Sequence, residues 1–598
     1  MYIACAIAIH MVVLGLANVV RVLVELATGT PPAAFLGLPF LFAEGSSRPG
    51  QTREQISLAL ALVLIGAPAW YLHWRSAQRA SDRSDEDRAS PLRSAYLHLV
   101  TFVTALLVFA HASFALEAVL DAWLRPAPSP DQLGVFTPPP PGQRVIGALA
   151  MVAVAGAAWA FHARTALTDR RRSAIGGAAA AIRRAHTYLL AGIGLFAALV
   201  GTTELLAELW RVTFETPRPS GTETRPGPIV VREIASPAGD RLRLAAISAL
   251  PGVILGAALW AVHWPPSQRL AAQSDVEGIA ERRSAIRKLA LYFVAFVSAV
   301  TVLAQLSRAL VGLLRGLLGD PDPGGGETLL AAAGTPLVSV AIFGAAWLLH
   351  RRVIALDTAR QPELETQADM RRAYYYLIAA IALAMLAIGT AGLVGVIGSY
   401  AMGYQTHRAS EIAGYIALIG VGLPFWAFHW SRNERHVWRG TAAESAAERR
   451  ARLRRIFLFV TIGGGGLVML VAGSSALYRI LDGLLAQDLG LPVVHDIWHL
   501  LVNTATGVAV ASWHWRVLAA DRRALAGALA LPHVPATAVP EPADAPLART
   551  VSFVVTVPEE RAASLRPRLE ELVGDTGRVE HAPHKPPLPT TANTSPTD

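Results

Sequence analysis

The chain has 598 residues, of which 53% are hydrophobic and 16% are charged, and its mean hydropathy is +0.40. Soluble globular proteins carry about 25% charged residues, so this composition excludes that class and predicts an all-α integral membrane protein. The net charge of +9 does not indicate nucleic-acid binding, because the arginines lie between apolar runs and so flank membrane spans. The single cysteine, Cys5, excludes an internal disulfide framework.

Apolar runs of about 20 residues, enough to cross a bilayer, recur along the whole chain. The first follows no basic segment, so we interpret it as a retained span and not as a cleaved signal peptide. The predicted spans are 2–26, 56–74, 95–123, 144–162, 186–211, 243–264, 289–317, 334–351, 373–401, 411–430, 455–484 and 494–515.

The twelve spans form six similar hairpins, each with an entering helix, an outer loop, a returning helix and an arginine-rich linker. Entering helices after the first begin with arginine and aromatic residues, as in "RRAYYYLI" from Arg371. Returning helices end in aromatic residues and histidine, as in "PFWAFHW" from Pro424. Because each hairpin has two helices, the copies are predicted to be direct repeats with one orientation. Their predicted bounds are 1–92, 93–182, 183–285, 286–370, 371–451 and 452–524.

The distribution of arginine orients the chain. Linkers such as "ERRARLRR" from Glu448 are arginine-dense, whereas most outer loops, such as "GDPDPGGGETLL" from Gly319, are not. The positive-inside rule therefore predicts cytoplasmic N- and C-termini. Arginine replaces nearly all lysine, which suggests a GC-rich bacterial genome and hence a cell inner membrane. After the last hairpin we expect an Ala/Pro-rich linker at 525–549, a small cytoplasmic strand–helix segment at 550–580 and a disordered tail at 581–598.

The helix start "RRAYYYLIAAIALAMLAIGTAGLVGVIG" from Arg371 resembles a bacterial multi-pass membrane domain-of-unknown-function family (DUF 5671-like). The domain of that family is a four-helix unit, equal to two of the hairpins. The resemblance therefore implies about three copies and leaves the chain after Trp515 unmatched. The first hairpin departs from the pattern because no arginine precedes its aromatic residue. The resemblance implies no activity.

Aromatic residues and histidines at the ends of the returning helices are the first candidate site. Tryptophan favours the bilayer interface, so we interpret the set as a cytoplasmic interfacial belt. Neutral imidazoles also bind haem or metals, which is the alternative. The set comprises Trp70, His73, Trp159, His162, Trp260, His263, Trp347, His350, Trp426, His429 and His514.

Acidic residues at the outer ends of two entering helices are candidate ion-binding residues. Glu117 and Asp121 form one i,i+4 pair, and Glu204 and Glu208 form another. We expect interfacial carboxylates paired with neighbours, since charge within the bilayer is costly. The alternative is a vestibule for a cation or a proton, shared between the copies. The predicted neutralising arginines are Arg21, Arg308 and Arg479.

A third candidate is "HDIWHLLVN" from His495. His495 and His499 share one helix face with Asp496 nearby, a spacing that can chelate a divalent metal. The sequence lacks the glutamate of a His-Glu-x-x-His motif at this place, which excludes a metalloprotease of that type. Aspartate also suits the dipole at a helix start, so a structural role is the preferred interpretation.

No nucleophile–base constellation, nucleotide motif or cofactor motif is visible, so we predict neither enzymatic activity nor a cofactor. The expected partners are the lipid bilayer and proteins bound through the C-terminal tail or through oligomerisation. A non-enzymatic membrane scaffold is the preferred function. The alternatives are a transporter or channel for a cation or small solute that uses the acidic outer ends, and a haem- or metal-binding membrane protein.

Overall fold

A computed structural model describes residues 1–29, 51–125, 141–173, 176–214, 238–319, 329–404 and 409–530, and these residues form helices joined by turns. The described residues up to Leu529 form one compact unit. The predicted strand–helix segment at 550–580 and the predicted tail at 581–598 lie outside the described residues, as does most of the linker at 525–549.

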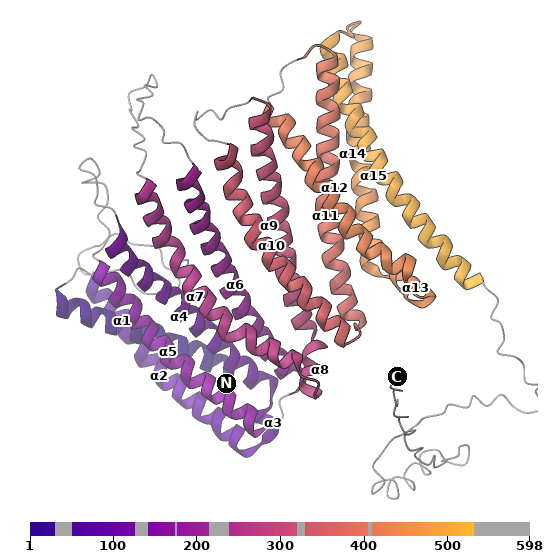
Figure 1. Ribbon diagram of the computed structural model, residues 1–598. Helices are drawn as coiled ribbons and strands as arrows, with labels where there is room; N and C mark the ends of the chain where they lie inside the picture. The colour runs from indigo at the N-terminus through magenta and orange to yellow at the C-terminus, as the bar shows by residue number, and fades with distance from the viewer. Residues whose placement is uncertain are drawn as a thin grey trace, which may run out of the picture. The chain divides into compact units, whose positions relative to one another are not determined.

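The described helices follow the predicted order of hairpins. The long helices are α1 (Tyr2–Thr28), α2 (Gln51–Arg83), α4 (Pro91–Leu124), α5 (Pro141–Arg172), α6 (Gly177–Phe214), α7 (Ala238–Ala272), α9 (Ala285–Leu317), α10 (Leu329–Arg360), α11 (Glu365–Ala401), α12 (Ala409–Arg439), α14 (Arg452–Leu485) and α15 (Leu491–Ala530). Several returning helices extend well past the predicted spans, because the linkers after them are rich in alanine and arginine, which favour helix. Figure 1 shows these helices in chain order.

Eleven helices in the described part of the chain are long and apolar enough to cross a membrane. They indicate a multi-pass membrane protein. The helix at the twelfth predicted span, α15, is 40 residues long but is not among the eleven.

Three short helices lie in the linkers between paired hairpins: α3 (Asp85–Arg88), α8 (Val276–Arg282) and α13 (Ala442–Arg450). Each begins at a side chain that accepts a hydrogen bond from a backbone N–H in the first turn: Ser84, Asp275 and Thr441. Such caps satisfy donors that a helix start leaves unpaired. The linkers therefore turn at fixed residues before the next entering helix begins.

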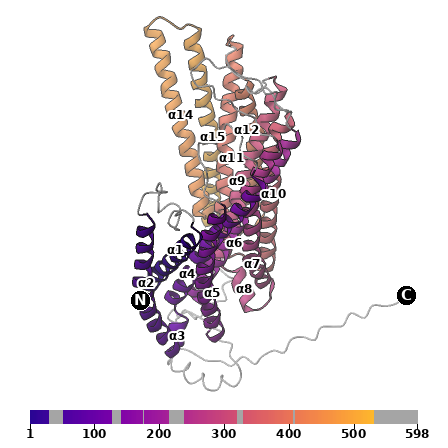
Figure 2. The same ribbon diagram turned by 90° about the vertical axis from the view of Figure 1, so that its left-hand side faces the viewer.

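Packing groups the helices into three four-helix units. In the first unit α1 packs against α2, α4 and α5, and in the second α6 packs against α7, α9 and α10. In the third unit α11 packs against α12 and α14. Figures 1 and 2 show α14 and α15 side by side. A Cβ on Gly465 of α14 would lie 2.7 Å from the carbonyl oxygen of Gly507 on α15, so glycine allows these two backbones to touch.

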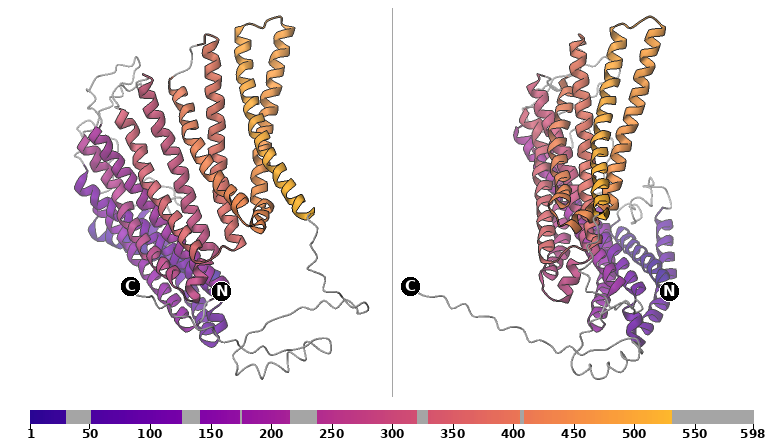
Figure 3. Two further views of the ribbon diagram at one scale, coloured as in Figure 1. Left: turned by 45° about the vertical axis from the view of Figure 1, so that its right-hand side comes forward. Right: turned by 90° about the vertical axis from the view of Figure 1, so that its right-hand side faces the viewer.

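Two junctions join neighbouring units. α4 of the first unit packs against α6 and α7 of the second, and α9 of the second unit packs against α11 and α12 of the third. Figure 3 shows the succession from the first unit to the third by colour. The third helix of one unit therefore contacts the first hairpin of the next.

Candidate functional site

A polar cluster of the second unit is centred on Arg287, near the start of α9. The side chain of Arg287 is completely buried. Its Nε donates to Asp357 of α10 at 2.8 Å. One Nη donates to Gln268 of α7 at 2.8 Å, and the other to the hydroxyl of Tyr188 of α6 at 2.8 Å. One guanidinium thus connects all four helices of the unit.

The first and third units repeat this arrangement, and we call the three sets the arginine clusters. Arg93 and Arg454, each 1% exposed, occupy the position of Arg287. The Nε of Arg93 donates to Asp169 at 2.7 Å and an Nη to Gln78 at 3.0 Å. The partners of Arg454 are Asp521 at 2.6 Å, Glu434 at 2.5 Å and Tyr376 at 3.3 Å.

The chemistry of an arginine cluster is that of a clamp. A guanidinium stays charged at any physiological pH and presents a rigid fork of donors. The carboxylate offsets its charge, and the amide and hydroxyl oxygens accept the remaining hydrogen bonds. Removing one partner from a buried ion pair typically costs about 3–5 kcal/mol, so each cluster makes the helices that it joins depend on one another.

Acidic residues of the linker helices extend two of the clusters. Glu281 of α8 accepts from Tyr188 at 2.6 Å and from Arg184 at 2.7 Å. In the third unit Glu448 of α13 accepts from Arg371 at 2.6 Å and from Arg372 at 2.9 Å. Burial would raise the pKa of Glu448, but the hydrogen bonds and charges of the two arginines outweigh burial and lower it.

The six predicted belt histidines share one local hydrogen bond. In each, Nδ1 lies 2.7–2.9 Å from the backbone carbonyl four residues earlier. His162, His350, His429 and His514 are at most 1% exposed. These four rings lie among protein side chains and therefore do not face lipid headgroups, whereas Trp159 is 38% exposed.

Two of the predicted belt tryptophans, Trp70 and Trp347, also have hydrogen-bond partners inside the protein. The indole N–H of Trp70 donates to Tyr96 at 3.3 Å, and that of Trp347 donates to Tyr374 at 2.7 Å. Tyr96 in turn lies 2.9 Å from Nε2 of His162. An interfacial role for the set stays a prediction, and the contacts add a packing role at the same depth.

Sequence reasoning missed a second row of tryptophans. Trp74, Trp264 and Trp430 are 6–8% exposed, one on the second helix of each unit. Each follows a belt tryptophan by four residues and precedes the Gln or Glu of the arginine cluster by four. Trp74 covers Arg93 at 5.7 Å from ring centroid to guanidinium, as Trp430 covers Arg454 at 5.8 Å. This spacing, present only in alternate hairpins, is the sequence signal that could have found them.

Two of the buried histidines, His350 of the second unit and His514 of the third, have no hydrogen-bond partner at Nε2 in the described part of the chain. His350 lies against Trp264, with ring centroids 5.0 Å apart, and His514 lies against Trp430 at 5.8 Å. These two imidazoles each lie against an aromatic residue of their own unit, so the structure does not bring them together as a pair of haem ligands.

Two of the four acidic candidates, Asp121 and Glu208, are paired with arginines of their own hairpins. Asp121 pairs with Arg125 and with Arg144 of α5. In the next hairpin, Glu208 pairs with Arg211 at 2.7 Å and lies 3.6 Å from Arg241 of α7.

The remaining acidic candidates and the predicted neutralising arginines lie elsewhere. Glu204 accepts from the hydroxyl of Ser248, and Glu117 is half-buried. Arg21 pairs with Glu25 at 2.6 Å, Arg479 lies 3.5 Å from Asp496, and Arg308 is exposed. The arginines next to the acidic pairs are thus not those that the sequence suggested.

The His495 candidate gains a partner from another hairpin. The hydroxyl of Ser399 on α11 lies 2.8 Å from Nε2 of His495 and 2.9 Å from Nε2 of His499. Glycines at 395 and 398 let the rings of α15 approach α11 this closely. Asp496 instead faces Arg479 and is half exposed. Within the described ranges no group of three or more His, Cys, Asp or Glu side chains could hold a metal.

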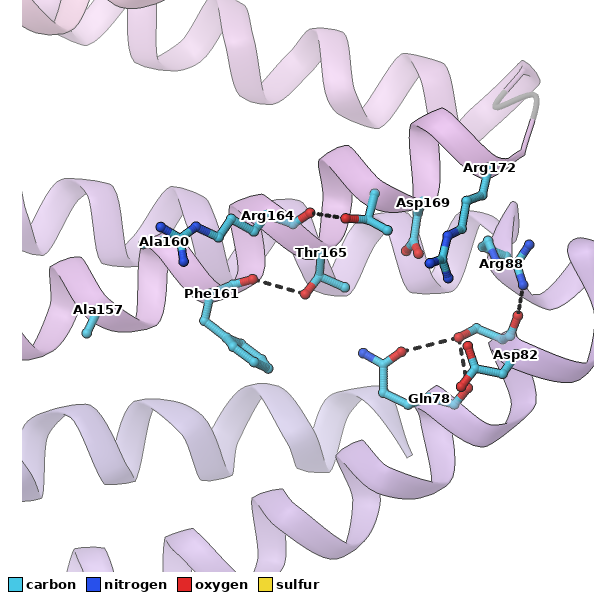
Figure 4. Close-up of a pocket in the computed structure, with 12 residues that line it drawn as sticks. Gln78, Asp82, Arg88, Ala157, Ala160, Phe161, Arg164, Thr165, Asp169 and Arg172 are labelled. Carbon is cyan, nitrogen blue, oxygen red and sulfur yellow. Dashed lines mark hydrogen bonds between the residues drawn. The ribbon is translucent and has the colours of Figure 1, made fainter.

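A cavity of about 530 Å³ lies between α2 and α5 in the first unit. Its lining includes Gln78 and Asp169, two members of the first arginine cluster, with Arg88, Arg164 and Arg172 nearby. Figure 4 shows Gln78 and Asp82 of α2 across from the α5 residues. The cavity is an open groove beside the cluster, and its charges are of both signs.

Comparison with known families now identifies the chain. The model of a domain of unknown function, DUF5671, matches residues 1–137, 227–345 and 372–513. The chain belongs to this family. Each matched segment contains one of the three cluster arginines, and the expectation of repeated DUF5671 copies is confirmed. No curated protein and no solved structure matches the chain.

Proposed function

We propose that this DUF5671 protein is a non-enzymatic scaffold of a bacterial inner membrane, with twelve spans in six direct hairpins and both termini in the cytoplasm. The observation that carries the proposal is the threefold arginine cluster. In all three units the best-buried charges connect helices to one another. A scaffold needs such fixed units, because a partner binds a surface whose helices hold their positions.

A transporter would use its intramembrane charges differently. Charges along a transport pathway have to exchange partners during the cycle, whereas Asp121 and Glu208 at the acidic outer ends pair with arginines of their own hairpins. That pairing favours the scaffold over the cation transporter.

Flux through proteoliposomes separates the two functions. We expect the reconstituted protein to pass sodium, potassium, calcium, protons and small solutes no faster than protein-free liposomes. If the protein passes one of these ions or solutes and the flux disappears in Glu204→Gln/Glu208→Gln, the protein is a transporter and the scaffold function is wrong.

A positive test places a photo-crosslinking residue at Val276 or Trp438, which are 83% and 70% exposed beyond the apolar segments. A scaffold should capture the same protein partner in repeated experiments in living cells. The matched control is Ala77, which is completely buried and should capture none. Capture of no protein from either exposed position would contradict the scaffold.

Reporter fusions test the proposed orientation. Fusions after Arg172, Arg352 and Asp598 should all report a cytoplasmic location, because they follow arginine-rich linkers or the C-terminus. A periplasmic signal after Asp598 would overturn the even number of spans or the orientation.

A further inference from the structure

The two junctions between units are built at equivalent positions. Leu303 of α9, Ala382 of α11 and Val421 of α12 form one buried cluster, and Leu303 and Val421 are each 3% exposed. Ile381 of α11 packs against the same cluster. The third helix of one unit thus buries an apolar face against the first hairpin of the following unit.

The cluster arginines set a common register for α4, α9 and α14. The fifth residue after the arginine is His98, Tyr292 or Phe459 in the three helices. His98 lies against His186 of α6, with ring centroids 5.3 Å apart, and Tyr292 against Tyr374 of α11 at 5.6 Å. The fifth residue after the cluster arginine therefore lies on the junction face of the third helix in both junctions.

The same face is open on α14. Phe459 is 50% exposed, whereas Tyr292 at the equivalent position is 6% exposed. Leu470 stands sixteen residues after Arg454, as Leu303 stands sixteen after Arg287. Leu470 is 61% exposed. The chain has no fourth unit among its described helices to cover this face.

The complementary face is open at the other end of the row. Ile65 of α2 stands five residues before Trp70, as Val421 stands five before Trp426, and Ile65 is 63% exposed. Ile7 of α1 stands five residues after Tyr2, as Ile381 stands five after Tyr376, and Ile7 is 60% exposed. Figures 1 and 3 show α1–α2 and α14–α15 on opposite sides of the intervening helices.

We propose that the open face of α14 binds the α1–α2 hairpin of a second copy of this chain in the membrane. An apolar face alone can be covered by lipid, but the two internal junctions show what this face binds when a hairpin of the family follows it. Such a contact is heterologous, because the two copies use different surfaces, and it leads to a ring or an open row. The proposal rests on the scaffold function and names one of its partners.

Cysteine cross-linking tests this contact in a Cys5→Ala background. Leu470→Cys in one tagged copy and Ile65→Cys in a differently tagged copy should form a disulfide-linked pair on mild oxidation in membranes. The matched control replaces Ile65→Cys by Ile254→Cys, which lies on α7 in the middle unit and is 50% exposed. The positive control carries Leu303→Cys and Val421→Cys in one chain, at the internal junction. These two cysteines should form a disulfide, which peptide mass spectrometry would detect.

The outcomes separate this inference from the scaffold function. Equal amounts of cross-linked product with Ile65→Cys and with Ile254→Cys would indicate random collision. If the internal Leu303–Val421 link forms but the Leu470–Ile65 link does not, the open face of α14 is covered by lipid and not by a second copy. Either result overturns the head-to-tail contact. A chain that fails here but still captures a different protein from Val276 or Trp438 keeps its scaffold function and loses only this partner.

Discussion

Substitution of Asp357 by asparagine is the sharpest test of the arginine clusters. The change keeps the size of the side chain but removes the negative charge beside Arg287, whose side chain is completely buried. Gln268 and Tyr188 are then its remaining neighbours, and both are neutral oxygen acceptors. Breaking a buried pair in this way typically costs about 3–5 kcal/mol of unfolding free energy.

An exposed ion pair provides the matched control. Arg170 and Glu277 lie 3.3 Å apart with side chains 44% and 66% exposed, and such pairs contribute about 0–1 kcal/mol. Unfolding titrations in mixed micelles should therefore show a much larger loss for Asp357→Asn than for Glu277→Gln. The double variant Arg287→Leu/Asp357→Leu should be more stable than Asp357→Asn, because no uncompensated charge remains. Equal losses for Asp357→Asn and Glu277→Gln would refute the clamp.

Three further predictions follow from the other groups. The pKa of Glu448 is lowered in the folded protein, so its contribution to stability is fully present above the unfolded carboxylate pKa of about 4.3 and is lost as the pH falls through the lower folded pKa. The melting difference between wild type and Glu448→Gln should therefore shrink as the pH is lowered from about 7 to well below the unfolded value, and a constant difference would contradict this. His162→Gln and His350→Gln should leave the metal content and the absorption spectrum unchanged, whereas loss of a Soret band in either variant would establish haem ligation. Sodium, potassium and calcium should leave the melting temperatures of wild type and of Glu204→Gln/Glu208→Gln unchanged, and a cation shift confined to wild type would favour transport.

The fold class follows from composition, because long apolar runs in a bilayer have to be helical to satisfy their backbone groups. The hairpin order also follows, from the alternation of arginine-led starts and aromatic ends. What the sequence does not provide is which helix faces meet. Arg287 and Asp357 are 70 residues apart, and Ser399 is 96 residues from His495, so periodicity within one helix carries no information about either contact.

The sequence predicts six similar hairpins, and the structure separates their returning helices into two kinds. In the second helix of each unit two tryptophans are spaced by four residues and followed by Gln78, Gln268 or Glu434. In the fourth helix the histidine is followed seven residues later by Asp169, Asp357 or Asp521. Because all six share a histidine after an aromatic segment, their common feature concealed this difference.

The two kinds of returning helix explain why the family repeats as a larger unit than a hairpin. The arginine and its aspartate lie on the third and fourth helices, whereas the Gln or Glu lies on the second and the tyrosines of the later units on the first. A single hairpin therefore cannot complete the cluster, and an arginine in it would be buried with unsatisfied donors, which is costly. The Arg–Asp pair is common to all three units. The second unit adds an ion pair between Arg184 of α6 and Glu281 of the linker helix α8, which connects that linker to the first helix of the unit.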